Sequence, residues 1–138
     1  MAKQKVRVLW TEGKQFIGTD SGKHSIVISS HDEANDTGIR PSDLLLLGLA
    51  SCTGYDVVNI LNKKRVDLQK LDIEVAPLQD DDPPWTFREI HLTFRVKGSD
   101  LTEKAIDQAI KLSLENYCSV ASTISGKAKI TYDFNVEE

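Results

Sequence analysis

The sequence predicts an α+β fold with the element order β-β-β-α-β-β-α-β, in which antiparallel sheets pack around a long buried central helix. Short alternating apolar segments with turn residues between them dominate the first forty positions. A long apolar segment follows the proline at position 41. Strands and helices do not alternate regularly along the chain, which favours antiparallel pairing over βαβ units. The 138 residues indicate one domain covering 1–138.

The N-terminal segment is expected to form a meander of three antiparallel strands. Apolar side chains alternate from Val6 to Trp10, and the glycine within 11–14 offers a hairpin turn. A return strand begins at Phe16. After a second turn, the β-rich segment 24–29 supplies the third strand, and the polar composition that follows predicts a loop.

The central helix is expected to begin at Pro41 and to run to about Lys64. Proline suits the first helical position, where its missing N–H is not needed, and the short polar Ser42 and Asp43 lie at the positive end of the helix dipole. The first half of this helix is apolar almost all round, which is typical of a helix buried on all sides. A domain of this size does not enclose such a helix alone, so we expect a homodimer.

The second half of the chain predicts three more strands and a second helix. Alternation from Lys70 to Val75 and again around Phe94 indicates two half-buried strands. The loop between them carries three aspartates but lacks the spacing of a calcium-binding loop. The remaining expected elements are an amphipathic helix from Thr102 to about Tyr117, a short helical turn through Val120 and Ile124, and a final strand from Ile130 to Val136.

Composition excludes several classes of partner and cofactor. Acidic residues outnumber basic ones by 21 to 17, giving a formal charge of -4, so nucleic acid is not expected as a partner. The N-terminus lacks the apolar stretch of a secretory signal, and no segment approaches the roughly 18 apolar residues of a membrane span. We therefore expect a cytoplasmic protein that is not bound to a membrane. The spacing of His24, His31 and His91 does not suggest zinc, and neither a metal nor a cofactor is expected.

Cys52 and Cys118 are the only cysteines, and each lies in an apolar segment rather than in a CxxC motif. They make one possible pair. A cysteine pair in a reducing compartment is more often catalytic or redox-sensing than a permanent bridge. The alternative is that both thiols are small apolar core residues, since free cysteine is among the most buried residue types.

A reactive thiol needs a lowered pKa, usually from a nearby cation. Arg40 lies next to the start of the helix, 12 positions before Cys52, or about 18 Å along a helix at 1.5 Å per residue. Within one chain it reaches Cys52 only if the loop folds back, whereas in a dimer it approaches the Cys52 of the partner. Asp43 is a candidate by the same argument, and its other interpretation is capping of the first turn.

Three segments together resemble the OsmC/Ohr family: Arg40-Pro41-Ser42-Asp43-Leu44-Leu45, Ala50-Ser51-Cys52-Thr53-Gly54-Tyr55-Asp56-Val57-Val58 and Glu115-Asn116-Tyr117-Cys118-Ser119-Val120. The stretch from Cys52 to Leu61 is more similar to the uncharacterised OsmC-like branch than to the well-studied hydroperoxide reductases. The resemblance implies an intertwined homodimer with its active sites at the subunit interface.

The resemblance also implies a chemistry, the reduction of organic hydroperoxides in the oxidative stress response. Cys52 would be the peroxidatic thiolate and Cys118 the resolving thiol, and an external dithiol of the lipoyl type would restore the pair. The reductases carry Glu immediately after the helix-opening proline, where this chain has Ser42, so Asp43 is the nearest carboxylate. The alternative function is a non-enzymatic OsmC-like protein that binds a small ligand or senses redox state.

Overall fold

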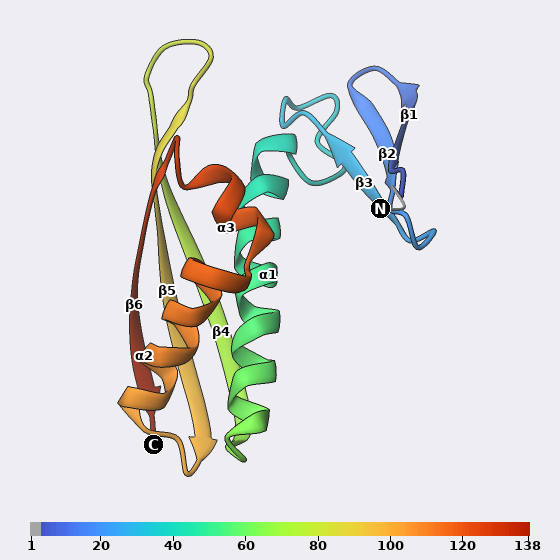
Figure 1. Ribbon diagram of the computed structural model, residues 1–138. Coiled ribbons are helices and arrows are strands. Elements are labelled where there is room, and N and C mark those ends of the chain that lie inside the picture. Colours follow the sequence, from blue (N-terminus) through green and yellow to red (C-terminus); the bar gives the residue numbers. More distant parts are fainter. Residues whose placement is uncertain (1–3) are drawn as a thin grey trace. The chain divides into compact units, whose positions relative to one another are not determined.

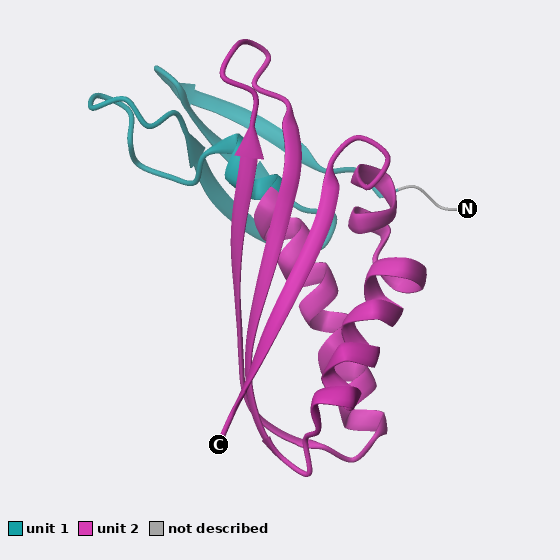
Figure 2. Ribbon diagram, turned by 90° about the vertical axis from the view of Figure 1, so that its left-hand side faces the viewer, with its two compact units in different colours: residues 1–45 teal, residues 46–138 magenta. Residues whose placement is uncertain are grey.

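The computed structural model describes residues 4–138 and divides the chain into two compact units, each described here by itself. Unit 1 is Met1–Leu45 and unit 2 is Leu46–Glu138 (Figure 2). The first three residues, which belong to the N-terminal segment where no secretory signal is predicted, lie outside the described residues.

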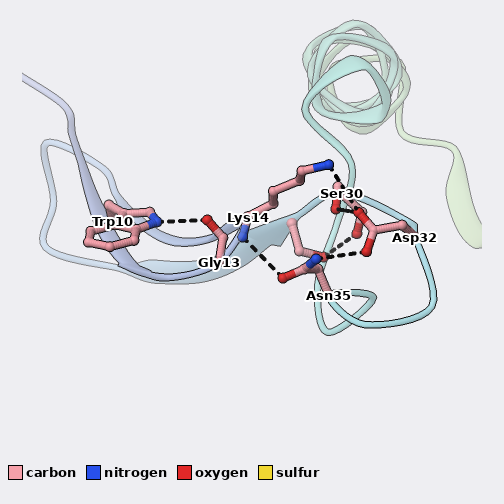
Figure 3. Close-up of polar contacts among 7 residues, drawn as sticks. Trp10, Gly13, Lys14, Ser30, Asp32 and Asn35 are labelled. Atoms are coloured by element: carbon pink, nitrogen blue, oxygen red, sulfur yellow. Dashed lines mark hydrogen bonds and ion pairs between the residues drawn. The ribbon is translucent and has the colours of Figure 1, made fainter.

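Unit 1 contains the predicted antiparallel meander. Its sheet has the order β1 (Arg7–Glu12), β2 (Gln15–Thr19) and β3 (Ser25–Ser29). The turn between β1 and β2 uses Gly13 at a positive φ of 54°, a conformation that glycine adopts without steric cost. The indole N–H of Trp10 donates to the carbonyl of this glycine at 2.8 Å and closes the turn (Figure 3).

Unit 2 contains a second three-stranded sheet covered on one face by helices (Figures 1 and 2). The long helix α1 (Pro41–Lys63) has the predicted start and ends one residue before the expected position, and it belongs to unit 2 from Leu46 onward. The sheet has the order β4 (Asp67–Gln79), β5 (Phe87–Ser99) and β6 (Lys129–Glu137). The core lies between helices and sheet and includes Leu49, Val57, Leu61, Ile90, Leu92, Phe94, Ile106 and Ile110.

The expectation of antiparallel sheets is wrong for one strand pair. β4 and β5 form an antiparallel hairpin, but β6 pairs with β5 in parallel, with Ile90 opposite Ile130 and Phe94 opposite Phe134. The chain between β5 and β6 is a helical crossover made of α2 (Glu103–Leu112), the π-helical turn η1 (Ser113–Tyr117) and α3 (Ser119–Ile124). A crossover of this length returns the chain to the end of the sheet where β5 began, so the next strand runs parallel to it.

Within one chain, the central helix is buried on one face and not on all sides. Its buried residues are Leu46, Leu49, Ala50, Thr53, Gly54, Val57 and Leu61. Leu47 and Tyr55, between these positions, are exposed. Contrary to expectation, α1 is long and apolar enough to span a membrane, with a mean hydropathy of 1.6. A core helix meets the same criterion, and the buried face of α1 packs into the core of unit 2.

The segment expected as one helix from Thr102 to about Tyr117 is divided into α2 and η1. Thr102 caps α2, since its hydroxyl accepts the N–H of Ala105 at 3.1 Å. The backbone widens into the π-turn at Ser113, and α3 follows it, where a short helical turn was predicted. Single π-turns within helices occur frequently at functional sites, which draws attention to the residues around η1.

Candidate active site

The two cysteines lie together in the interior of unit 2. Cys52 is in the third turn of α1, half-buried, and packs against the core cluster that contains Cys118. Cys118 is only 2% exposed and lies between η1 and α3. The structure therefore places the two cysteines, 66 residues apart in the sequence, at the same core cluster.

The backbone around Cys118 holds its thiol in a fixed position. Its own N–H donates to the carbonyl of Ser113 at 2.8 Å, five residues back, which completes the π-turn. Its sulfur accepts the N–H of Ala121 at 3.3 Å, so Cys118 caps α3 as a serine would. The thiol is thus held at the junction of two helical segments.

Burial raises the pKa of the Cys118 thiol above its ordinary value of 9.0, and the contact with Cys52 raises it further. The N–H of Ala121, which donates to the sulfur, and the hydroxyl of Thr53 oppose this increase in pKa. The raised pKa keeps this thiol protonated at neutral pH. Since the attacking species in thiol chemistry is the thiolate, Cys118 is suited to the second step of a reaction rather than the first.

Thr53 follows Cys52 on α1 and faces the core. Its side chain is completely buried, and its hydroxyl has no hydrogen-bond partner of acceptable geometry among residues 4–138. An unpaired buried hydroxyl costs about 1–3 kcal/mol. The Thr53 hydroxyl lowers the pKa of the Cys118 thiol and is therefore a donor available to the sulfur when charge develops there.

Two further polar residues, which were not predicted from the sequence, lie near the cysteines. The hydroxyl of Ser113, completely buried at the start of η1, donates to Oδ2 of Asp56 at 2.7 Å. Asp56 is one helical turn after Cys52, and Ser113 is five residues before Cys118. The sequence has a polar residue near each cysteine, but no pattern in the sequence pairs these two polar residues.

Arg40 and Asp43 lie in unit 1, at the start of α1, while both cysteines belong to unit 2. Both side chains are exposed, and neither forms a side-chain hydrogen bond or ion pair with any residue from 4 to 138. Asp43 lies in the first turn of α1, as expected for a residue that complements the helix dipole. Their role in activating Cys52 therefore stays a prediction.

Two open grooves border α1 within unit 2. One, of about 500 Å³, is lined by Asp56, Ile60, Leu112 and Tyr117, with Lys63 and Lys64 among its other lining residues. The other, of about 490 Å³, lies over the exposed apolar side of α1 and includes Leu47, Tyr55, Leu71 and Ile73. Among the residues that the structure describes, no three His, Cys, Asp or Glu side chains come together as metal ligands.

The chain is similar to known proteins over most of its length. The family model described as "OsmC-like protein" matches residues 33–133, and Protein YhfA of Escherichia coli (strain K12) is 33% identical over 130 residues, which cover 94% of this chain and 96% of YhfA. The chain belongs to the OsmC-like protein family. The match spans α1, the cysteine pair and most of unit 2.

Solved structures of OsmC-like proteins and their relatives share the fold. The crystal structure of a hypothetical protein from Aquifex aeolicus VF5 superposes with a TM-score of 0.84 at 29% identity and covers all of both chains. The organic hydroperoxide resistance protein OhrB of Bacillus subtilis superposes with a TM-score of 0.65 at 18% identity, covering 97% of this chain and 98% of OhrB. The second likeness concerns the fold alone.

Proposed function

We propose that this OsmC-like protein is a thiol-dependent reductase of organic hydroperoxides that uses Cys52 and Cys118 as a redox pair. The observation that carries the proposal is the placement of these two thiols, the only cysteines of the chain, at the same core cluster. Membership of the OsmC-like family and the shared fold with a protein named for organic hydroperoxide resistance support the same reaction class.

The reaction proceeds in three balanced steps. The Cys52 thiolate attacks one peroxide oxygen of ROOH and the O–O bond breaks, which makes Cys52 a sulfenic acid. The alkoxide takes up a proton from solvent and leaves as ROH. The Cys118 thiol then attacks the sulfur of Cys52, water leaves, and a disulfide forms. An external dithiol reduces this disulfide by exchange and is itself oxidised to a disulfide, which returns both cysteines to the thiol form.

The environments of the two sulfurs support this assignment of roles. Cys52 is half-buried and so is the more accessible to a peroxide, whereas Cys118 is enclosed and has a raised pKa. The apolar core around the pair favours an organic substrate over hydrogen peroxide. Activation of Cys52 is assigned to Arg40 and Asp43 of the partner subunit.

The homodimer is part of the proposal because both units leave apolar side chains exposed. In unit 1 these include Val8 and Trp10, the latter 62% exposed, and in unit 2 they include Leu47 and Tyr55. Single exposed apolar residues are ordinary in soluble proteins, but contiguous patches mark interaction surfaces. A second copy of the chain would cover them.

The test is the consumption of tert-butyl hydroperoxide by the purified, reduced protein with dihydrolipoamide as the dithiol. The wild type should turn over repeatedly, and Cys52→Ser should abolish consumption. Cys118→Ser should consume about one equivalent and accumulate a sulfenic acid at Cys52, which dimedone traps for mass spectrometry. No turnover of either tert-butyl or cumene hydroperoxide with dihydrolipoamide would contradict the proposal.

A redox sensor or small-ligand binder on the same fold is the second candidate. It is favoured by Ser42 at the position where the reductases carry Glu and by the side chains of Arg40 and Asp43, which pair with no described residue. A sensor would form the Cys52–Cys118 disulfide on exposure to peroxide but would not be restored by a dithiol at a catalytic rate. The turnover measurement therefore separates the two candidates.

A further inference from the structure

The hydrogen bond between Ser113 and Asp56 joins the two elements that carry the cysteines. Its donor is the buried hydroxyl at the start of η1, and its acceptor lies on α1, with Oγ and Oδ2 2.7 Å apart across 57 positions of sequence. One other side-chain hydrogen bond among the described residues joins the end of the α1 segment to the α2–η1–α3 layer, that of Lys64 to Gln108, and it is exposed. The Ser113–Asp56 bond is therefore the interior link between them.

Ser113 makes two connections at once. Its hydroxyl holds Asp56, and its carbonyl accepts the N–H of Cys118 at 2.8 Å through the π-turn. Asp56 in turn is fixed to Cys52 by one turn of α1, because residues four apart lie on the same side of a helix. This path leads from Cys52 through Asp56 and Ser113 to Cys118, and both cysteines pack at the same core cluster.

We infer that Asp56 and Ser113 are positioning residues that hold Cys118 against Cys52 and so favour formation of their disulfide. Disulfide geometry is narrow, with an S–S bond of about 2.05 Å and Cβ atoms about 3.8 Å apart, so small shifts of α1 against η1 have large effects on bond formation. This Asp56–Ser113 clamp raises the effective concentration of the Cys118 thiol at the Cys52 thiol. The inference rests on the proposed redox pair, but it concerns disulfide formation and not the oxidant.

The carboxylate suits this task better than a second hydroxyl would. Asp56 accepts the Ser113 proton through a charge-assisted bond, which is shorter and stronger than one between neutral groups. It is also only partly buried, and it lines a groove with Tyr117 and Leu112.

The test measures the equilibrium between the dithiol and disulfide forms in buffers of reduced and oxidised dithiothreitol, without peroxide. Ser113→Ala should lower the equilibrium constant for disulfide formation about tenfold, which corresponds to about 30 mV for a two-electron couple. Asp56→Ala should have the same effect. Asp56→Asn keeps an oxygen that accepts from Ser113 and should stay within about threefold of the wild type.

Gln108→Ala is the matched control, because it removes the exposed link between the same layers without touching either cysteine. It should leave the equilibrium constant unchanged. Removing one partner leaves a buried polar group unpaired, whereas removing both can be nearly neutral. The double variant Ser113→Ala/Asp56→Ala therefore keeps the measurement possible if a single variant does not fold, and it should show the tenfold loss while its reduced form melts close to the wild type.

Each outcome decides the inference. A folded Ser113→Ala or double variant with the equilibrium constant of the wild type overturns it, and so does Asp56→Asn if it is as damaging as Asp56→Ala. A wild type that forms no Cys52–Cys118 disulfide overturns both the clamp and the redox pair. A wild type that forms the disulfide but consumes no hydroperoxide contradicts only the peroxidase, and the effects of the variants then still support the clamp.

Discussion

The two units of this OsmC-like chain solve the problem of burial in different ways. In unit 2, β5 presents Ile90, Leu92, Phe94 and Val96 to a core closed by helices, and all four are fully buried. In unit 1, every residue of β1 is exposed, and β3 buries only Ile28 and Ser29. The same alternating pattern of apolar residues therefore yields a closed core in one unit and an open sheet in the other.

The difference teaches that unit 1 does not hold its fold by a core of its own. Its contacts are turn and loop hydrogen bonds, such as those that tie Asn35 to Lys14 and Asp32 (Figure 3). A small antiparallel sheet without packing on one face is only marginally stable in water. Under the proposed homodimer, the open face of unit 1 is completed by association, while unit 2 keeps the cysteine pair in a preformed interior.

The largest expected effect comes from opening the core of unit 2. Phe94→Ala should lower the free energy of unfolding by about 3–5 kcal/mol, since the ring is fully buried and its removal leaves a cavity. Leu9→Ala in β1 is the control in unit 1 and should cost less than about 1 kcal/mol, because Leu9 is exposed. Urea denaturation of all three proteins at one concentration measures both values. Equal losses would contradict the contrast between the units.

A second prediction asks which face of the unit 1 sheet is covered by a partner. Ile26 and Val27 are neighbours on β3, both 42% exposed, and point to opposite faces of the sheet. Ile26 lines a groove of about 400 Å³ with Val8 and Gly18. Ile26→Asp should weaken the dimer tenfold or more, because an unpaired carboxylate would be buried at the interface.

Val27→Asp is the matched variant for that experiment and should leave the dimer within about threefold of the wild type. Sedimentation equilibrium measures the dissociation constants of all three proteins. Dissociation by Val27→Asp and not by Ile26→Asp would move the interface to the opposite face. A wild type that is monomeric at micromolar concentration would leave unit 1 an open sheet and contradict the homodimer.

The sequence was sufficient for the elements but not for the direction of the last strand. The alternation of apolar and polar residues located the strands β1 to β6, and Pro41 located the start of α1. Half-buried strands have the same pattern whether they pair in parallel or antiparallel, so β6 could be located but not oriented. Its direction depends on the crossover through α2, η1 and α3, which is a property of the whole segment between the strands.

The candidate site was predictable to the extent that composition specified it. Two cysteines in a chain make one possible pair, and the structure places Cys52 and Cys118 at the same core cluster. Asp56 and Ser113 could not be paired in advance, because their contact depends on the π-turn, which adds one residue to the helical turn before Cys118. Helical periodicity assumes a constant 3.6 residues per turn and does not anticipate such a change.

A third prediction concerns the alkaline side of the pH range, where unit 2 should lose stability. The pKa of Cys118 is raised in the folded protein, chiefly by burial, so the folded state keeps this proton at pH values where the unfolded state releases it. The resulting stabilisation is fully present below the unfolded pKa near 9.0 and is lost as the pH rises toward the folded value. In reduced protein, the free energy of unfolding should therefore fall above pH 9 more steeply in the wild type than in Cys118→Ser.

Thr53→Val sharpens this measurement. Valine keeps the shape of threonine but lacks the hydroxyl that lowers the pKa of Cys118, so the alkaline loss should extend to higher pH. The variant also removes an unpaired buried hydroxyl and should be as stable as the wild type, or more so, at pH 7. Tyr132, whose pKa burial and Asp107 raise to about 12, contributes only above pH 10, so the window from pH 9 to 10 isolates the thiol.

The smallest expected effect lies in unit 1, at the acid end. Hydrogen bonds from Ser30 and Asn35, with the charge of Lys14, lower the pKa of Asp32 to about 2 (Figure 3). A depressed carboxylate pKa contributes stability that is present above its ordinary value of 3.8 and is lost as the pH falls toward 2. Because this carboxylate is exposed, the contribution should be slight, and NMR titration of its side-chain carbon is a more sensitive measurement than denaturation. Asn35→Ala should raise the Asp32 pKa toward 3.8 without changing the alkaline behaviour of Cys118, whereas an unchanged Asp32 pKa would mean that the loop of unit 1 is not held by these bonds.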